Sequence, residues 1–202
     1  MKFNWFKKIV KDYPKFWETY LSYFDENQSK DKRYVVFDCE TTGLDYKSDR
    51  ILSIGAVAIQ NNQVIVGDFM EVFLLQDVFK PESVPIHGIL KEGKEEKIVE
   101  AEAVIRFLDF IKDATLVGHH VDFDIEMINQ ALDRLNVGNL KNQAMDTDVM
   151  YQKLKYLPFE QHTSLDELCD VYKIKKSDRH TASGDAFITA LLFLKLKKKL
   201  EI

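Results

Sequence analysis

Asp38 and Glu40 are the first residues whose types and spacing could do chemistry. They follow the run YVVF at residues 34–37, whose β-branched and aromatic side chains are typical of a strand buried on both faces. Because side chains alternate along a strand, Asp38 and Glu40 point to one side and Cys39 to the other. Two acids at the end of a buried strand repel each other, and a bound cation would offset that repulsion. This stretch alone is consistent with a metal site or with an acidic surface turn.

Two more carboxylates and a histidine stand near expected helix starts. Asp124 follows the short apolar strand 114–117, and Asp185 lies in the last helix, five residues after His180. Each has a structural explanation on its own, since acids favour helix N-termini and a histidine is often a surface residue. In an open α/β sheet, however, such segments meet outside the carboxyl ends of strands. The four acids together form an all-oxygen set suited to Mg²⁺ or Mn²⁺.

An α/β sheet is expected to position these residues. Residues 34–37, 51–59 and 64–75 read as three consecutive antiparallel strands, with a tight turn at Asn61-Asn62 between the last two. Residues 114–117 and 144–146 add two parallel-type strands. Helices are expected over residues 95–111 and 181–200, after Asp124, and after Ser164, which begins a capping box; residues 81–88 are expected to be irregular. The sequence therefore predicts a mixed five-stranded sheet flanked by helices.

An amphipathic arm precedes the α/β region. Apolar and aromatic residues recur at three- and four-residue steps over residues 3–24, and Pro14 interrupts them, so two short helices are expected. We interpret their apolar face as packing on the protein's own domain; the alternative is a docking arm for a protein partner. The predicted organisation is an arm over residues 1–28, a linker over 29–33 and an α/β domain over 34–202.

Composition narrows the function classes. The 202 residues are 46% hydrophobic, enough for a sizeable core in one domain. The formal net charge of −5 argues against a general electrostatic nucleic-acid binder but allows a site where metal ions neutralise phosphate. Cys39 and Cys169 do not make a disulfide framework, and no apolar run approaches membrane-spanning length. A reducing, cytoplasmic compartment and no membrane contact are expected.

Three ordered motifs resemble those of the DnaQ-like superfamily of 3′-to-5′ exonucleases. They are Asp38-Cys39-Glu40-Thr41-Thr42-Gly43, then His119-His120-Val121-Asp122-Phe123-Asp124, then His180-Thr181-Ala182-Ser183-Gly184-Asp185. The resemblance covers residues 33–200. A sibling branch has tyrosine four residues before the last acid, where this chain has Thr181. The histidine one residue earlier favours the four-acid-plus-histidine (DEDDh) branch, which includes the proofreading epsilon subunit of bacterial DNA polymerase III.

The resemblance implies an RNase H-like fold and release of nucleoside monophosphates from single-stranded or frayed 3′ ends, with DNA favoured over RNA, in proofreading or repair. Two divalent cations, Mg²⁺ or Mn²⁺, roughly 3.5–4 Å apart would activate water and stabilise the leaving oxygen. The implied metal ligands are Asp38, which would bridge both ions, Glu40, Asp124 and Asp185, and the implied general base is His180. The implied contacts to the terminal nucleotide are Thr41, Thr42, Gly43, Leu44 and Phe123. A DNA polymerase is an implied partner of the arm.

One departure and several alternatives accompany this interpretation. His120 stands where the family often has asparagine, and we interpret His119 and His120 as structural or outer residues rather than metal ligands. Asp122 is a rival to Asp124 as the ligand, although the Phe-Asp pairing favours Asp124. The same fold could trim RNA 3′ ends, because discrimination of the 2′-OH depends on contacts at the terminal sugar. A non-catalytic polymerase-associated module is disfavoured, since no structural role requires four acids and a histidine.

Overall fold

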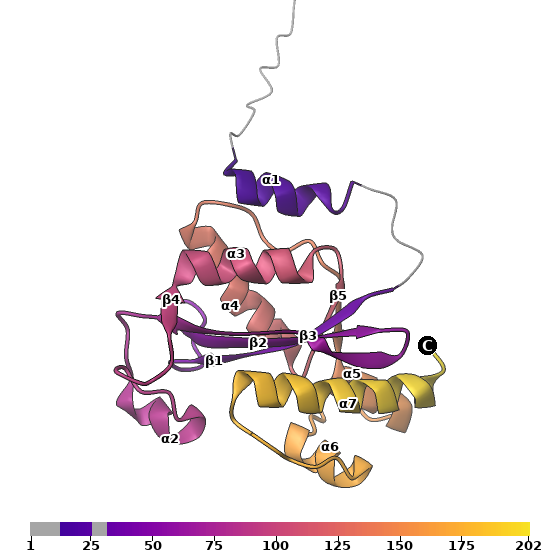
Figure 1. Ribbon diagram of the computed structural model, residues 1–202. Coiled ribbons are helices and arrows are strands. Elements are labelled where there is room, and N and C mark those ends of the chain that lie inside the picture. Colours follow the sequence, from indigo (N-terminus) through magenta and orange to yellow (C-terminus); the bar gives the residue numbers. More distant parts are fainter. Residues whose placement is uncertain (1–12, 26–31) are drawn as a thin grey trace, which may run out of the picture.

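A six-stranded mixed sheet forms the middle of three layers (Figure 1) in the computed structural model, which describes residues 13–25 and 32–202. The strand order is β4-β3-β2-β1-β5-β6. The strands are β1 (Tyr34–Thr41), β2 (Ile51–Gln60), β3 (Gln63–Leu75), β4 (Lys97–Val99), β5 (Thr115–Gly118) and β6 (Ala144–Asp146). The first three are antiparallel neighbours, and each of the others runs parallel to the strand it joins. The predicted mixed sheet, with three antiparallel strands and parallel additions, is confirmed.

Helices cover both faces of the sheet (Figure 1). One face carries α1 (Lys15–Ser22), α3 (Glu100–Ile111) and α4 (Val121–Arg134), and the other carries α5 (Thr147–Lys155), α6 (Leu165–Tyr172) and α7 (Ala182–Leu200). Each face has its own buried apolar cluster, so β1 and β2 are covered on both sides. Among the described residues, no helix combines the length and apolarity needed to cross a bilayer.

Strand β1 divides its side chains between the two cores. Val35, Phe37 and Cys39 belong to the cluster under α3 and α4, whereas Tyr34 and Val36 belong to the cluster under α7. Because side chains alternate, residues 38 and 40 continue the second row and face α7. The predicted placement of two acids on one side of this strand follows directly from that alternation.

The sheet has one strand more than the predicted five. Residues 97–99 were expected within a helix over 95–111, but they form β4, parallel to residues 73–75 of β3, and α3 begins at Glu100. Pairing with a distant strand decides the conformation of these three residues, and local periodicity does not report it. Residues 81–88, expected to be irregular, contain the short helices η1 (Pro81–Ser83) and α2 (Val84–His87).

Helix α1 packs on the sheet domain. Trp17 and Tyr20 are each 1% exposed and lie in the same apolar cluster as α3 and α4. The Tyr20 hydroxyl donates to Asn142 Oδ1 at 2.6 Å and accepts from the Lys141 N–H at 2.8 Å, and burial raises the pKa of Tyr20 to about 12. Over residues 15–22 the apolar face therefore packs on the protein's own domain. The other expected helix, in residues 3–12, lies outside the described residues, and the boundary at residue 28 stays a prediction.

Candidate active site

Three carboxylates from two elements meet on the α7 side of the sheet. Asp38 and Glu40 lie at the end of β1, and Asp185 lies in the first turn of α7. One carboxylate oxygen from each lies within 4.8 Å of the other two. Thr181 caps α7, since its hydroxyl accepts the N–H of Gly184 at 3.1 Å. The cap fixes where the helix starts and therefore where Asp185 sits.

Asp124, in the first turn of α4, is the fourth acid of the site. Its Oδ1 accepts the N–H of Cys39 at 3.0 Å, between the two acids of β1, and only 5% of the residue is exposed. Its rival Asp122 is exposed on the same helix. His119, at the start of the same motif, forms a hydrogen bond of 2.9 Å between its Nδ1 and Thr147 Oγ1. Burial lowers the pKa of His119 to about 4. Within this motif, Asp124 is the acid that reaches the site.

Burial and mutual repulsion raise the pKa values of Asp38, Glu40 and Asp124. Burial, followed by the charge of Asp185, raises the pKa of Glu40 to about 7, and burial raises the pKa of Asp124 to about 8. Burial and then the charges of Asp124, Asp185 and Glu40 raise the pKa of Asp38 well above its usual range. Without a cation, these side chains hold protons close to neutral pH.

The donor set fits divalent metal ions. All four groups are carboxylates, the ligands that Mg²⁺ and Mn²⁺ prefer. Oδ1 of Asp185 is buried without a hydrogen-bond partner, and a buried polar atom left in that state is costly unless something binds it. A cation at this place would satisfy that oxygen and would favour the ionised form of its neighbours.

Arg179 is part of the site and was missed from the sequence. Its Nη1 pairs with Oδ2 of Asp185, while Nε and Nη2 donate to the two oxygens of Asp166 in α6, each at 3.1 Å. Its position directly before His180 is the signal that could have pointed to it. The guanidinium places a fixed positive charge beside the acids and ties them to α6.

His180 contacts the acid cluster through its backbone N–H. Its N–H donates to Oδ2 of Asp185 at 3.3 Å, its φ is 61°, and the residue is exposed. Among the described residues, its ring is not part of the cluster that Asp38, Glu40 and Asp185 form. A left-handed backbone conformation is uncommon for residues other than glycine, although histidine adopts it more often than most, as asparagine and aspartate do.

The predicted substrate contacts in the turn after β1 differ in their exposure to solvent. Thr42 is 1% exposed, and its hydroxyl donates to Asp49 Oδ1 at 2.7 Å while accepting the Arg50 N–H at 3.0 Å. That hydroxyl is committed to the turn and is not available to a nucleotide, because the residue is enclosed. The Thr42 hydroxyl therefore positions the turn, and the expected contact of this residue with the terminal nucleotide stays a prediction.

The remaining residues of this turn stay accessible. Thr41 donates to the Gly43 carbonyl at 2.8 Å, and a Cβ at Gly43 would lie 2.6 Å from Asp49 Oδ2, so a larger residue there would have to displace the Asp49 carboxylate. Leu44 is 85% exposed, whereas Phe123, in the first turn of α4, is half-buried and packs against the apolar core. Leu44 is the apolar side chain of this set that is free to cover a base.

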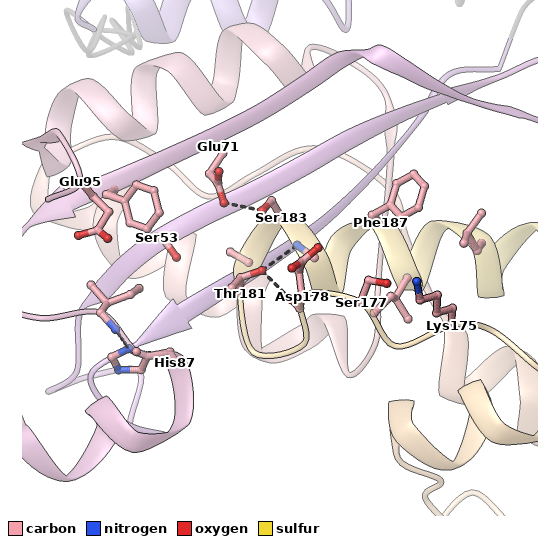
Figure 2. A pocket seen from close by; sticks show the side chains of 17 residues that line it. Ser53, Glu71, His87, Glu95, Lys175, Ser177, Asp178, Thr181, Ser183 and Phe187 are labelled. Carbon is pink, nitrogen blue, oxygen red and sulfur yellow. Dashed lines mark hydrogen bonds between the residues drawn. The ribbon is translucent and has the colours of Figure 1, made fainter. Parts of the chain in front are cut away.

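A cavity of about 640 Å³ lies beside the start of α7 (Figure 2). It lies between the start of α7, strands β2 and β3, and the loop after α2, and none of the four carboxylates lines it. Ser53 lines it and stands opposite Glu40 across the β1–β2 ladder, so the two side chains share a face. His87 lines it too, but its ring is used structurally, by Ser83 Oγ and by the Ile89 N–H, each at 3.0 Å.

Comparison with known proteins shows the relationships of the chain. The RNase_T model, described as Exonuclease, matches residues 35–193. DNA polymerase III subunit epsilon from Salmonella typhimurium is 35% identical over 172 residues, covering 80% of this chain and 70% of that protein. A PolC-type DNA polymerase III from Caldanaerobacter subterraneus is 32% identical over 188 residues, covering 88% of this chain. The chain spans only 12% of the length of that PolC-type relative.

Solved structures share the fold. Exonuclease I from E. coli, in complex with a dT13 oligonucleotide, matches with a TM-score of 0.72 and 21% identity over 84% of this chain and 42% of that one. Exonuclease X in complex with 5′ overhanging duplex DNA matches with a TM-score of 0.65 and 18% identity over 84% of this chain and 93% of that one. The predicted RNase H-like architecture is confirmed. Together, the motifs, the family match and the epsilon relatives show that this chain belongs to the RNase_T family of DnaQ-like exonucleases.

Proposed function

We propose that the chain is a metal-dependent 3′-to-5′ exonuclease that releases nucleoside monophosphates from DNA 3′ ends. The observation that carries this function is the convergence of Asp38, Glu40 and Asp185 within 4.8 Å, with Asp124 bonded to the backbone between the first two. Four clustered acids, with the pKa values of Asp38, Glu40 and Asp124 raised by burial and repulsion, are an unfavourable arrangement for stability alone. Divalent cations at such a site supply Lewis acidity that activates water and offset the charge that builds on the leaving oxygen.

The roles of the residues follow from their positions. Asp38 clusters with Glu40 and Asp185, and the N–H of its neighbour Cys39 binds Asp124, so Asp38 is the group suited to bridge two ions. Glu40 and Asp185 would complete the first site and Asp124 the second. His180 acts as general base: an exposed imidazole near the acids can turn toward a bound 3′ end, and catalytic contacts often tighten only when substrate binds. Thr41 and the backbone of Gly43 face the terminal nucleotide, and Leu44 covers its base.

DNA is the favoured substrate because of the relatives. The epsilon and PolC-type proteins are named as DNA polymerase III components, and the exonuclease I and exonuclease X structures contain DNA. The cavity beside Ser53 and Thr181 offers room for the nucleotides that precede the 3′ end. We further propose that the arm over residues 1–28 contacts a DNA polymerase or another protein partner, through side chains other than Trp17 and Tyr20, which the chain itself covers.

A digestion assay tests this function. The full-length protein, with Mg²⁺ or Mn²⁺, is given 3′-recessed, mismatched and single-stranded DNA beside matched RNA, all labelled at the 5′ end. We expect single-nucleotide shortening from the 3′ end, faster on single-stranded or mismatched DNA, and no product after chelation. Faster shortening of RNA would reassign the substrate, whereas absence of products from every substrate would favour the non-catalytic module.

Two matched variants complete the experiment. Asp124→Asn should lower activity at least about tenfold, as the loss of a metal-supporting group does. Asp122→Asn makes the same chemical change two residues away on the same helix, at an exposed position, and should behave as the wild type. Equal losses from both variants would mean that Asp124 has no special role.

A further inference from the structure

Two histidines and an aspartate form a second cluster, apart from the carboxylate site. His120 is the N-cap residue of α4, Asp148 lies in the first turn of α5, and His162 lies in the loop between α5 and α6. The Nδ1 of His162 lies 2.8 Å from Asp148 Oδ2, and the Nδ1 of His120 lies 3.9 Å from the same oxygen. One nitrogen or oxygen from each residue lies within 4.8 Å of the other two. The cluster thus joins three segments that are separate in the sequence.

Asp148 is a fixed and buried member of this cluster. It is 1% exposed, its Oδ1 accepts the Thr163 N–H at 3.0 Å, and its Oδ2 accepts the Gln152 side-chain amide at 3.2 Å. The same amide donates to the backbone carbonyls of Phe159 and Gln161, at 3.1 and 3.0 Å. These bonds fix the loop against α5 so that the second histidine is held beside the carboxylate. Metal-binding carboxylates are oriented by hydrogen bonds of this kind.

His120 combines an uncommon backbone conformation with a half-exposed ring, which packs edge-on against His119 with 4.5 Å between the ring centroids. Its φ of 60° and ψ of 43° place it in the left-handed region, which glycine or asparagine adopts at lower cost. Its side chain is 49% exposed, and that of His162 is 57% exposed, so both imidazoles are open to ions from solvent. The two rings lie 5.4 Å apart between centroids, in an edge arrangement. The backbone therefore holds an imidazole toward a buried carboxylate at a position where a smaller residue would be less strained.

The donor set differs in kind from that of the catalytic acids. Two imidazole nitrogens and one carboxylate oxygen suit Zn²⁺ and related transition-metal ions, whereas an all-oxygen set suits Mg²⁺ or Mn²⁺. Ligand atoms about 2.0–2.2 Å from a tetrahedral zinc ion lie about 3.4 Å from one another. The two nitrogen-to-oxygen distances of 2.8 and 3.9 Å fall on either side of that spacing. Small rotations of two exposed rings would therefore complete the geometry.

We propose that His120, Asp148 and His162 bind a zinc-type divalent ion, with water in the remaining position. A metal ion bound at Nδ1 of His162 would replace the contact between that nitrogen and Asp148, and the proton of the neutral ring would then reside on Nε2. The ion would connect the start of α4 to α5 and to the loop before α6. Because the first turn of α4 carries Asp124, an occupied site would stabilise the segment that positions one catalytic acid.

Zinc and cobalt titrations of the full-length protein test this site. With Mg²⁺ in excess, zinc binding is followed by competition with a chromogenic chelator, and cobalt binding by visible absorption, which is intense for tetrahedral and weak for six-coordinate sites. We expect one tight zinc ion per chain, a tetrahedral cobalt spectrum and a zinc-dependent rise in melting temperature. Substitutions His120→Asn, which keeps a residue tolerant of positive φ, and His162→Gln should each weaken zinc binding at least about tenfold.

Two controls separate this site from the carboxylate cluster. His180→Asn makes the same change at another exposed, left-handed residue, with φ of 61°, and should retain zinc affinity. Asp38→Asn removes a central catalytic acid and should retain the tetrahedral cobalt spectrum. The proposal is overturned if the wild type binds no zinc under magnesium competition, if both cluster variants keep wild-type affinity, or if Asp38→Asn abolishes the spectrum.

Discussion

Arg179 holds Asp185 from outside the acid cluster. Its guanidinium pairs with Oδ2 of Asp185, whereas Oδ1 of the same carboxylate is buried without a partner. Arg179 also reaches Asp166 through two bonds of 3.1 Å, so the first turns of α6 and α7 are connected through one cation. One oxygen of Asp185 is thus neutralised by the protein, and the other is left for a ligand.

Substitution Arg179→Met should destabilise the metal-free protein by on the order of 2–4 kcal/mol, because a buried carboxylate loses its ionic partner. Divalent cations should restore more stability to this variant than to the wild type, since they supply the missing charge. The measurement is thermal unfolding in chelator and in Mg²⁺ or Mn²⁺. The control Lys176→Met removes a cation from the exposed pairs with Asp166 and Asp170 and should leave the melting temperature nearly unchanged.

Stability of the metal-free protein should fall as pH rises through neutrality. The pKa of Glu40 is raised to about 7 and that of Asp124 to about 8, above the ordinary values of the unfolded chain, so the folded state binds more protons between about pH 4 and pH 8. The stabilisation that these bound protons give the folded state is present in full below about pH 4 and is lost as pH rises through the raised pKa values of Glu40 and Asp124. Since one pKa unit is worth about 1.4 kcal/mol, the loss should reach a few kcal/mol.

Denaturant unfolding in chelator at several pH values measures this slope. Asp124→Asn should flatten it, because an amide does not titrate, and Mg²⁺ or Mn²⁺ should remove the loss at high pH by favouring the ionised acids. Asp122→Asn, at an exposed position of the same helix, should leave the slope unchanged. A slope of the opposite sign between pH 6 and pH 8 would contradict the raised pKa values.

Much of the fold could be predicted because local patterns and long-range packing agree. The turn at Asn61-Asn62 has both residues at positive φ, 52° and 58°, as a two-residue hairpin requires, and the capping box of Ser164 and Glu167 is formed. Strand β4 could not be predicted, since three residues carry no period and their pairing with residues 73–75 is distant in sequence. The sixth strand depends on tertiary structure alone.

The four acids of the candidate site could be predicted from the sequence, but the residues that hold the site in place could not. Alternation along β1 and first-turn positions on α4 and α7 place Asp38, Glu40, Asp124 and Asp185, and these are visible in the sequence. The supports are residues whose partners are far along the chain: Arg179 joins Asp166, and Asp49 joins Lys80 at 2.6 Å. The bonds of the Thr42 hydroxyl could not be predicted either, since its buried partner, Asp49, lies beyond the motif.

Substitution His180→Asn should lower kcat by about 10²–10⁴-fold while metal binding is retained. Asparagine tolerates the left-handed backbone at this residue, so the loss would report the imidazole and not local strain. Metal-induced thermal shifts check the binding, and a pH–rate profile checks the role. If the variant regains full activity at elevated pH, His180 is not the general base.

Substitutions Leu44→Ala and Thr42→Val should separate substrate contact from turn structure. Leu44 is 85% exposed, so its truncation should leave stability unchanged and lower kcat/KM about tenfold through lost contact with the base. Thr42→Val removes a buried hydroxyl and leaves Asp49 without that donor, at a cost of about 1–3 kcal/mol. Melting temperatures and steady-state kinetics distinguish the two. A stable Thr42→Val protein with weakened substrate binding would restore Thr42 as a contact.

Gly55 determines how closely α7 approaches the acids. It stands opposite Asp38 across the β1–β2 ladder, and a Cβ built there would overlap the backbone of Ala182 and Ser183 at the start of α7. Substitution Gly55→Ala should therefore push that helix start away from the sheet. Because Asp185 lies in the same first turn, it would move away from Asp38.

The expected result is a destabilisation of about 1–3 kcal/mol, as for other overpacked sites, together with a loss of activity that excess Mg²⁺ or Mn²⁺ partly restores. Gly67→Ala is the matched control, since a Cβ there meets no atom within 4 Å. Denaturant unfolding and metal titration of activity measure both effects. If Gly55→Ala binds metal as tightly as Gly67→Ala does, the distance between α7 and β1 does not set the geometry of the acids.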